Sequence, residues 1–191
     1  MSSTPTTTGI STLAELSGAY TIDPAHSQIG FVARHAMVTK VRGAFNEFEG
    51  NFTVDGSDLS RSSAQVTIQV DSLDTRNAQR DGHVKSGDFL AIEQFPTITF
   101  TTTAVEQTGP TSLELTGDLT IKGTTRSVTV PFEFAGGVTD PFGNQRVGFE
   151  GATSINRSDY GITWNAALET GGVLVSEKIT LEFEISATKN A

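Results

Sequence analysis

The sequence predicts an all-β protein whose strands close into an eight-stranded antiparallel barrel. Three observations favour this fold. The 191 residues include 19 Gly and 12 Phe, and Thr recurs throughout, a composition typical of strands joined by turns and bulges. Eight segments alternate apolar and polar residues with the two-residue period of a strand. Cysteine is absent, which excludes a disulfide framework and thiolate metal sites and leaves packing to stabilise the fold.

The alternating segments define the expected strands. In the second strand the apolar phase shifts after Phe45, which predicts a β-bulge that helps the sheet to curl. An open sheet of eight amphipathic strands would expose an edge, whereas a barrel removes it. Eight strands enclose a space that is either filled by side chains or holds one small ligand. The expected strands span 28–35, 41–54, 64–70, 97–101, 113–121, 128–134, 147–155 and 179–185.

One segment between the third and fourth strands lacks alternation. Residues 77–95 carry several charged side chains, and Pro96 follows them. Because proline disfavours a helical residue before it, the pattern predicts one or two short helices that end here. We expect this insert to cap or flank one mouth of the barrel.

The N-terminal residues predict a tail and no targeting signal. Residues 1–18 are mostly Ser and Thr, with no basic residue and no apolar run beyond two residues, so we expect a flexible tail before a single domain over 19–188. A signal-peptide core and a membrane span of about 20 apolar residues are both missing from the sequence. We therefore expect a cytoplasmic protein without an integral membrane segment, unless a leader precedes this chain.

The charge balance is acidic. Thirteen Lys and Arg against 22 Asp and Glu give a net charge of −9 and a pI of about 4.7. Binding to nucleic acid requires clustered basic residues, so we expect no nucleic-acid partner. The same balance argues against electrostatic docking on anionic lipid.

Two groups of polar residues are candidates for catalysis or metal binding. Asp23, His26 and Ser27 resemble a hydrolase triad, but adjacent strand residues point to opposite faces, so a strand-entry turn is favoured. His26, His35 and His83 are the three histidines, and none of the compact spacings of a zinc site occurs. We therefore predict neither a catalytic residue nor a metal site.

Phenylalanine dominates the inward phase of the strands. Prenyl tails suit a bore lined with rings, but the same rings can form an ordinary core. For His35, ligand contact and a structural hydrogen bond stay open alternatives. The charges of the insert form either a polar rim for a ligand head group or a helix held by Arg–Asp pairs. The candidate ligand-contacting residues are Phe31, His35, Phe45, Phe52, Arg80, His83, Phe89, Phe100, Phe132, Phe134, Phe149, Trp164 and Phe183.

An ordered set of short motifs runs through almost the whole domain, from Tyr20 to about Ile185. With these motifs the chain resembles the YceI-like family of polyisoprenoid-binding proteins, which have a lipocalin-like barrel. Many members of that family carry a secretory leader, which is not recognisable here. The motifs lie at 20–27, 31–35, 41–45, 80–83, 88–89, 95–100, 117–123, 156–157 and 160–161.

The resemblance implies non-enzymatic binding, storage or transport of a long-chain isoprenoid, a quinone or a fatty amide in the bore. It implies no cofactor other than the bound lipid. Two alternatives stay open. One is a hydrolase or isomerase that acts on an isoprenoid-type substrate with His35, His83 and Asp81 at the mouth. The other is a filled barrel that serves as an interaction module. A homodimer is possible through side-chain contacts, since a closed barrel has no free edges.

Overall fold

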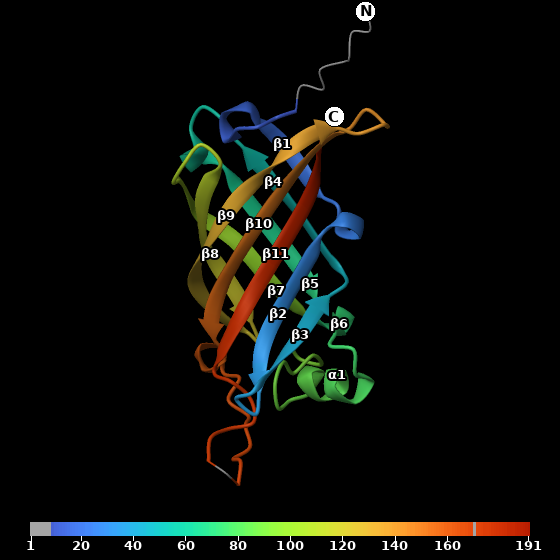
Figure 1. Cartoon of the computed structure of the whole chain (residues 1–191), viewed down its shortest axis with the longest axis vertical. Coiled ribbons are helices and arrows are strands. Elements are labelled where there is room, and N and C mark those ends of the chain that lie inside the picture. Colours follow the sequence, from blue (N-terminus) through green and yellow to red (C-terminus); the bar gives the residue numbers. More distant parts are fainter. Residues whose placement is uncertain (1–8, 170) are drawn as a thin grey trace, which may run out of the picture.

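The computed structural model describes residues 9–169 and 171–191, which form a closed antiparallel barrel (Figure 1). Hydrogen bonding runs in the order β1-β4-β5-β7-β8-β9-β10-β11 and returns from β11 to β1. The strands are β1 (Gly18–Ile22), β2 (Gln28–His35), β3 (Thr39–Phe45), β4 (Phe48–Val54), β5 (Ser63–Gln69), β6 (Leu73–Asp74), β7 (Thr97–Gln107), β8 (Ser112–Ile121), β9 (Thr124–Thr139), β10 (Gln145–Asn156) and β11 (Lys178–Lys189).

Three pairs of short strands each act as one interrupted strand of the wall. β1 and β2 both pair with β11, β3 continues into β4, and β5 continues into β6. Within this part of the wall β1 pairs with β4 and β2 pairs with β3. Counted in this way the barrel has eight strands in simple sequential order, which confirms the predicted fold class.

The interruptions of the three strands lie beside one another. The 3-10 helix Pro24–His26 separates β1 from β2, and the 3-10 helix Val70–Ser72 separates β5 from β6. Residues 46–47 separate β3 from β4, and the Asn46 amide donates to the Ser72 carbonyl at 3.2 Å. The expectation of one bulged strand over 41–54 is therefore wrong. The apolar phase shift after Phe45 marks a break between two strands, at the exposed residues 46–47.

Ser186 of β11 stands where that strand changes partner from β2 to β1. Its carbonyl accepts from the Asp23 amide at 2.8 Å and from the Ser27 hydroxyl at 3.0 Å, and its amide donates to the Ser27 hydroxyl at 2.9 Å. The break in the ladder therefore leaves no orphaned main-chain group at Ser186, as a closed wall requires.

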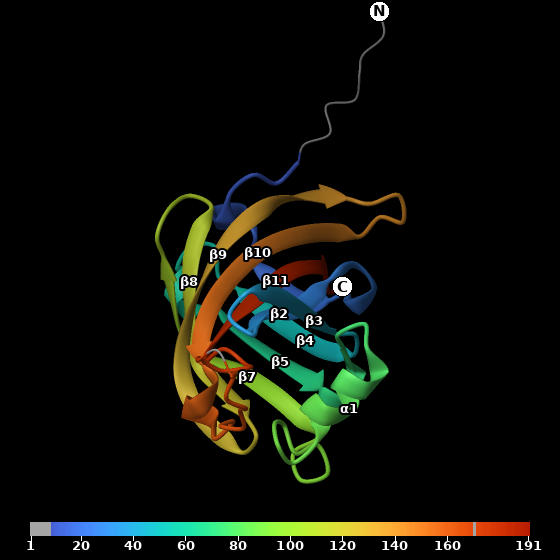
Figure 2. The same cartoon turned by 60° about the horizontal axis from the view of Figure 1, so that its bottom comes forward.

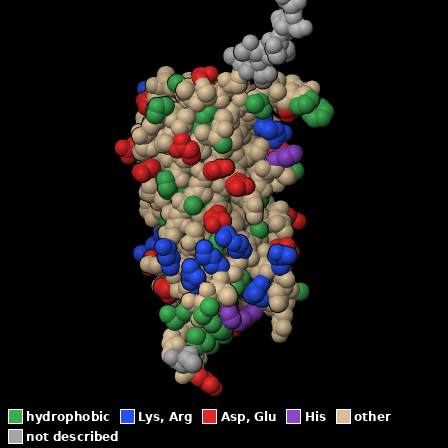
Figure 3. Space-filling model, in the orientation of Figure 1, with side chains coloured by type: hydrophobic (Ala, Val, Ile, Leu, Met, Phe, Trp, Pro, Cys, Tyr) green, Lys and Arg blue, Asp and Glu red, His purple; other side chains and the backbone are tan. Residues whose placement is uncertain are grey.

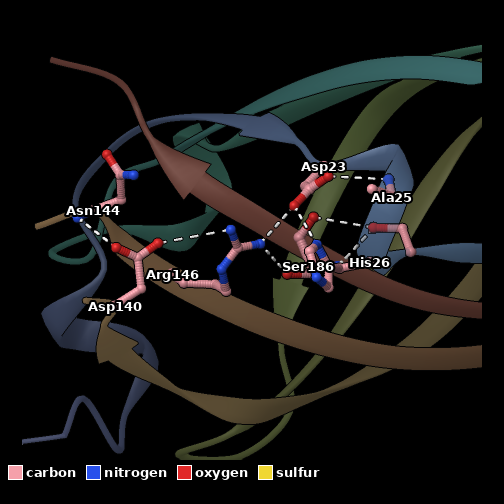
Figure 4. Close-up of polar contacts among 8 residues, drawn as sticks. Asp23, Ala25, His26, Asp140, Asn144, Arg146 and Ser186 are labelled. Carbon is pink, nitrogen blue, oxygen red and sulfur yellow. Dashed lines mark hydrogen bonds and ion pairs between the residues drawn. The ribbon is translucent and has the colours of Figure 1, made fainter. Parts of the chain in front are cut away.

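Asp23 anchors the same break electrostatically (Figure 4). One carboxylate oxygen lies 2.8 Å from Arg146 Nη1 and 2.7 Å from His26 Nδ1, and the other accepts from the Ala25 amide. Hydrogen bonds from Arg146 and then His26 lower the pKa of Asp23 to about 2. Because Ser27 bonds to Ser186 and not to His26, the triad-like residues form a strand-entry turn, as predicted.

Residues 10–17 close one end of the barrel, which we call the closed end. Leu13 and Leu16 are completely buried there, and the Leu16 carbonyl accepts from the Tyr20 hydroxyl at 2.9 Å. The ring of Tyr20 stacks on that of Phe52 at 5.0 Å. The expected tail over 1–18 is therefore too long, because residues 10–17 pack on the barrel. Residues 1–8 lie outside the described part of the chain.

The insert between the third and fourth wall strands forms one helix, α1 (Ala78–Lys85), at the opposite end of the barrel (Figure 1). The Asn77 side chain caps it by accepting from the Arg80 amide at 3.0 Å, a typical N-cap contact. This confirms the predicted helix. None of the helices in the described residues has the length and apolar character needed to cross a bilayer.

Leu16→Ala tests the packing of the N-terminal segment. Truncating a fully buried leucine typically lowers the free energy of unfolding by about 2–5 kcal/mol, and we expect a loss in this range by chemical denaturation. Val138→Ala, at a half-exposed side chain, is the control and should change the value by less than about 0.5 kcal/mol. An equally small effect of Leu16→Ala would contradict the packing of this segment.

Asp23→Asn tests the anchor at the strand break. Folding lowers the pKa of Asp23 from 3.8 to about 2, so its contribution is complete above pH 4 or so and disappears as the pH falls towards about 2. The side chain is 21% exposed, and after allowance for solvent screening we expect a loss of about 1 kcal/mol at neutral pH. The difference from wild type should vanish in acid, and a loss that stays constant from neutral pH down to acid would contradict this contribution.

Candidate ligand-binding site

A cavity of about 750 Å³ occupies the bore of the barrel. It extends from α1 and the loop 161–177 to side chains of β4, β7, β8 and β10 beneath the closed end. We call the end formed by α1, this loop and the β2–β3 and β8–β9 turns the mouth end (Figure 2). The bore is therefore hollow. Of the two alternatives for an eight-stranded barrel, this is the one with room for a small ligand.

Phenylalanine rings cover glycines on neighbouring strands of the cavity wall. The ring of Phe31 occupies the space that a side chain at Gly43 would need, directly across from it on β3. A ring held over a glycine lies along the wall and leaves the centre of the bore open. The same arrangement recurs for Phe100 over Gly117 and for Phe132 over Gly151, where an added Cβ would lie 2.6 Å from the ring.

Nearly all the predicted contact residues line this cavity. The exception is Phe134, which is buried among the closed-end side chains and lies 5.3 Å from the ring of Phe149. Its strand phase points inward as predicted, but Leu13 and Leu16 belong to the same cluster and fill the barrel at that level. The lining members are Phe31, His35, Phe45, Phe52, Arg80, His83, Phe89, Phe100, Phe132, Phe149, Trp164 and Phe183.

The sequence interpretation missed the aliphatic lining and several polar residues, among them the buried Thr75 and Arg157. Most of the aliphatic residues lie on strands that also carry rings, and all of them follow the inward phase of their strand, so the period-two pattern contained the signal. Among them are Ile29, Val66, Ile98, Leu119, Val128, Leu181 and Ile185.

His83 connects α1 to the loop that follows β10. Its ring makes edge contacts with Phe89 at 5.0 Å and with Trp164 at 4.7 Å. Its Nε2 lies 2.9 Å from the carboxylate of Asp88. The three rings form one side of the mouth, so a ligand that enters the bore must pass them.

Thr75 lies between Arg80 and Asp81 at the mouth. The Arg80 Nε donates to the Thr75 hydroxyl at 2.8 Å, and that hydroxyl donates to the Asp81 carboxylate at 2.5 Å. The Thr75 amide also donates to Asp81 at 2.8 Å. The side chains of the insert thus stabilise the helix and line the cavity at once, although Arg80 and Asp81 are bridged by Thr75 and not paired directly.

His35 ends β2 at the mouth, where it is exposed and lines the cavity. Its side chain makes no hydrogen bond with any other described residue, so the structural alternative for this residue finds no support. Within residues 9–169 and 171–191, no three His, Asp or Glu side chains come together as metal ligands.

Arg157 holds the loop 161–177 across the mouth. It is 4% exposed, and its guanidinium donates to the carbonyls of Ser176, Ile162 and Trp164 at 2.8–2.9 Å. Burial lowers the pKa of Arg157, while Glu177 opposes that shift. Arg157 therefore anchors this loop to the end of β10.

Arg157→Lys should release this loop, because one ammonium group cannot reach carbonyls spread along two chain segments. Unsatisfied buried acceptors cost about 1–3 kcal/mol each, so we expect a loss of at least about 2 kcal/mol by denaturation. Limited proteolysis should then cut within 161–177. Arg126→Lys, at an exposed arginine bonded to one carbonyl, is the control. Unchanged protease resistance in Arg157→Lys would contradict this role.

This chain is similar in sequence to known proteins. Residues 20–187 match the model of the YceI-like domain. A UPF0312 protein of Staphylococcus aureus strain MSSA476 is 42% identical over 169 residues, which cover 88% of this chain and 95% of that protein. A UPF0312 protein of strain N315 is 43% identical over the same length.

Solved structures share the barrel. Burkholderia cenocepacia BcnA superposes with a TM-score of 0.77 at 28% identity and covers 87% of this chain and 99% of its own. The Campylobacter jejuni YceI protein gives 0.72 at 26% identity, over 83% and 90%. A polyisoprenoid-binding domain from Saccharophagus degradans gives 0.68 at 14% identity, over 90% and 98%, a likeness of fold alone. From the domain match and the Staphylococcus relatives together, the chain belongs to the YceI-like family.

Proposed function

We propose that this protein binds a long-chain isoprenoid or a related amphiphilic lipid, with the tail in the bore and the head group at the mouth. The observation that carries the proposal is the polarity of the cavity along its length. Beneath the closed end the lining is mainly apolar, with Phe52, Leu115 and Phe149, although Thr53, Ser62 and Ser63 also border it, whereas Arg80 and His83 lie at the mouth.

The size of the cavity suits a lipid tail. A volume of about 750 Å³ lies within the range of about 300–1,000 Å³ typical of ligand pockets. Burial of one CH₂ group contributes about 0.8 kcal/mol, so a five-carbon isoprene unit contributes about 4 kcal/mol before the cost of ordering the tail. A few buried units therefore suffice for tight binding. Because residues 10–17 close the far end, we expect affinity to stop rising once the tail fills the bore.

The mouth side chains favour a head group that accepts hydrogen bonds. Arg80, Asn77, Gln79 and His35 line this end, and each can donate an N–H. The carbonyl of a quinone or of a fatty amide and the hydroxyl of a prenyl alcohol are acceptors of this kind. The binding named for the Saccharophagus domain of the same fold supports the same ligand class.

A binding role without turnover is favoured over the enzyme alternative. The enzyme alternative relies on His35, His83 and Asp81 at the mouth, but Asp81 accepts from Thr75 while His83 lies against Asp88. The hollow bore disfavours the filled interaction module. Storage or transport of the lipid, the cytoplasmic location and the homodimer stay predictions.

The test uses Trp164, the one tryptophan of the sequence, as the reporter at the mouth. Titration with geranylgeraniol should change its fluorescence and saturate at one lipid per chain. Ala33→Phe adds a ring to the cavity lining, whereas Val32→Phe is its matched control on the outward face of the same strand. We expect Ala33→Phe to weaken binding at least about tenfold, as loss of several buried CH₂ contacts requires, and Val32→Phe to bind like wild type.

Solvent extraction and mass spectrometry of protein purified from its own host complete the test. A stoichiometric prenyl lipid, recovered chemically unchanged, supports the proposal. No extracted lipid together with unchanged Trp164 fluorescence would overturn it. Consumption of the added lipid during long incubation would favour the enzyme alternative.

A further inference from the structure

We infer that the mouth end docks on the surface of an anionic phospholipid bilayer. Two surface features carry this inference. The apolar tip consists of Met37, Val38 and Val173. The basic belt consists of the Lys and Arg side chains on the turns and strand ends around it, namely Arg34, Lys40, Arg42, Lys122, Arg126 and Lys178.

The apolar tip is a continuous exposed surface. Met37 is 64% exposed, Val38 74% and Val173 40%. The two segments touch, because the Ala36 amide donates to the Leu174 carbonyl at 2.8 Å and the sulfur of Met37 covers Gly172. The tip thus protrudes beside the opening of the cavity, where apolar side chains meet water.

The backbone of the β2–β3 turn makes this exposure unusual. Ala36 and Met37 both have positive φ, 51° and 62°, and the Val38 amide donates to the His35 carbonyl at 3.1 Å. The loop between the paired His35 and Thr39 has three residues. Two successive positive φ angles favour Asn and Gly, and a non-glycine residue there is strained. The turn therefore presents an apolar side chain where a small polar residue would give a more stable hairpin.

The charges on this turn also destabilise the β2–β3 hairpin. Residues 34–42 contain three basic residues and no acidic one, and Arg34 lies directly opposite Lys40 in the strand register. Like charges at opposed positions destabilise a strand pair. Anionic groups bound between them would remove that repulsion, so the arrangement suits a negatively charged surface.

The β8–β9 turn adds to the belt on the other side of loop 161–177. Residues 121–128 carry Lys122 and Arg126 and no acidic residue, and Lys178 begins β11 between the two turns. Figure 3 shows Lys and Arg side chains in a band above the hydrophobic side chains of this end.

Both sides of the mouth carry acidic residues. Asp71 and Asp88 lie on the helix side, and exposed Asp159, Glu169 and Glu177 lie in or beside the loop on the strand side. On the strand side the six basic residues of the belt outnumber these three and Glu182, which pairs with Arg42, so the strand side is the docking face.

The closed end carries an acidic turn. The β7–β8 turn at the closed end is flanked by Glu106 and Glu114, and Glu133 lies beside it on β9. The expectation that this protein avoids anionic lipid rested on the net charge of the whole chain. That sum hides the basic excess on the strand side of the mouth, and surface attraction acts over only about 8–10 Å at physiological salt, so the local charge decides.

A bilayer fits these features better than a protein partner does. Three apolar side chains offer little area against the roughly 800 Å² per partner of a stable protein interface. Shallow insertion of a few apolar side chains, combined with Lys and Arg near the head groups, is the usual pattern of interfacial membrane binding. Docking in this orientation would bring the cavity mouth to the membrane, and in that respect alone the inference rests on the proposed function.

Vesicle flotation tests the docking. We expect wild-type protein to float with phosphatidylcholine vesicles that contain phosphatidylglycerol, to bind pure phosphatidylcholine at least about tenfold more weakly, and to dissociate as salt is raised. The variant Ala36→Asn/Met37→Gly has the residues that the turn favours. It should keep or raise the Tm while vesicle binding falls about tenfold, which separates docking from folding.

Charge reversal and matched controls complete the design. Lys40→Glu should weaken binding to the anionic vesicles by about tenfold or more, since each basic side chain contributes about fivefold. Phe142→Ser removes an apolar side chain that is 88% exposed on the β9–β10 turn at the closed end, and Arg61→Glu reverses a charge at that end. Both controls should bind vesicles like wild type.

Three results would overturn the inference: no flotation of wild type, equal losses in the closed-end controls, or unchanged binding of both mouth-end variants. The geranylgeraniol titration uses no vesicles, so failures of the two proposals are distinguishable. Saturable titration without flotation would refute docking alone, and flotation without a titration signal would refute the cavity ligand alone.

Discussion

Closure of the wall at β11 is the constraint on which the rest of the structure depends. This strand pairs with β10 along its whole length, and on its other side it meets β2 and then β1. The change of partner at Ser186 would leave main-chain groups unpaired, but Ser27 and Asp23 satisfy them. Because the ring is closed by hydrogen bonds and not by a filled interior, the bore is free to be hollow.

The hollow bore then follows from how its side chains are held. Rings such as Phe31 lie over glycines and leave the centre open, while Leu13 and Leu16 fill the far end. At the near end Arg157 ties the loop 161–177 to the barrel through main-chain carbonyls. The result is a pocket with a mainly apolar far end and a polar entrance, the asymmetry on which the proposed function rests.

Charge is distributed along the same axis. The turns of the mouth end carry basic residues next to exposed apolar ones, whereas the turn between β7 and β8 is acidic. Such an asymmetry has little effect on folding but a large one on orientation near a charged surface. The opening of the pocket and the proposed membrane contact thus share one end of the barrel, an arrangement suited to a lipid that moves between bilayer and protein.

The sequence by itself determined the strand periodicity, the count of eight wall strands, the helical insert and the inward phase of the rings, because these depend on local alternation. It could not show that the wall breaks at three adjacent strands, that residues 10–17 plug the bore, or that Phe134 belongs to the plug. Those depend on which segments meet in space. Only the tertiary structure decided that the bore is hollow, since whether rings fill a barrel or line it depends on the glycines across from them.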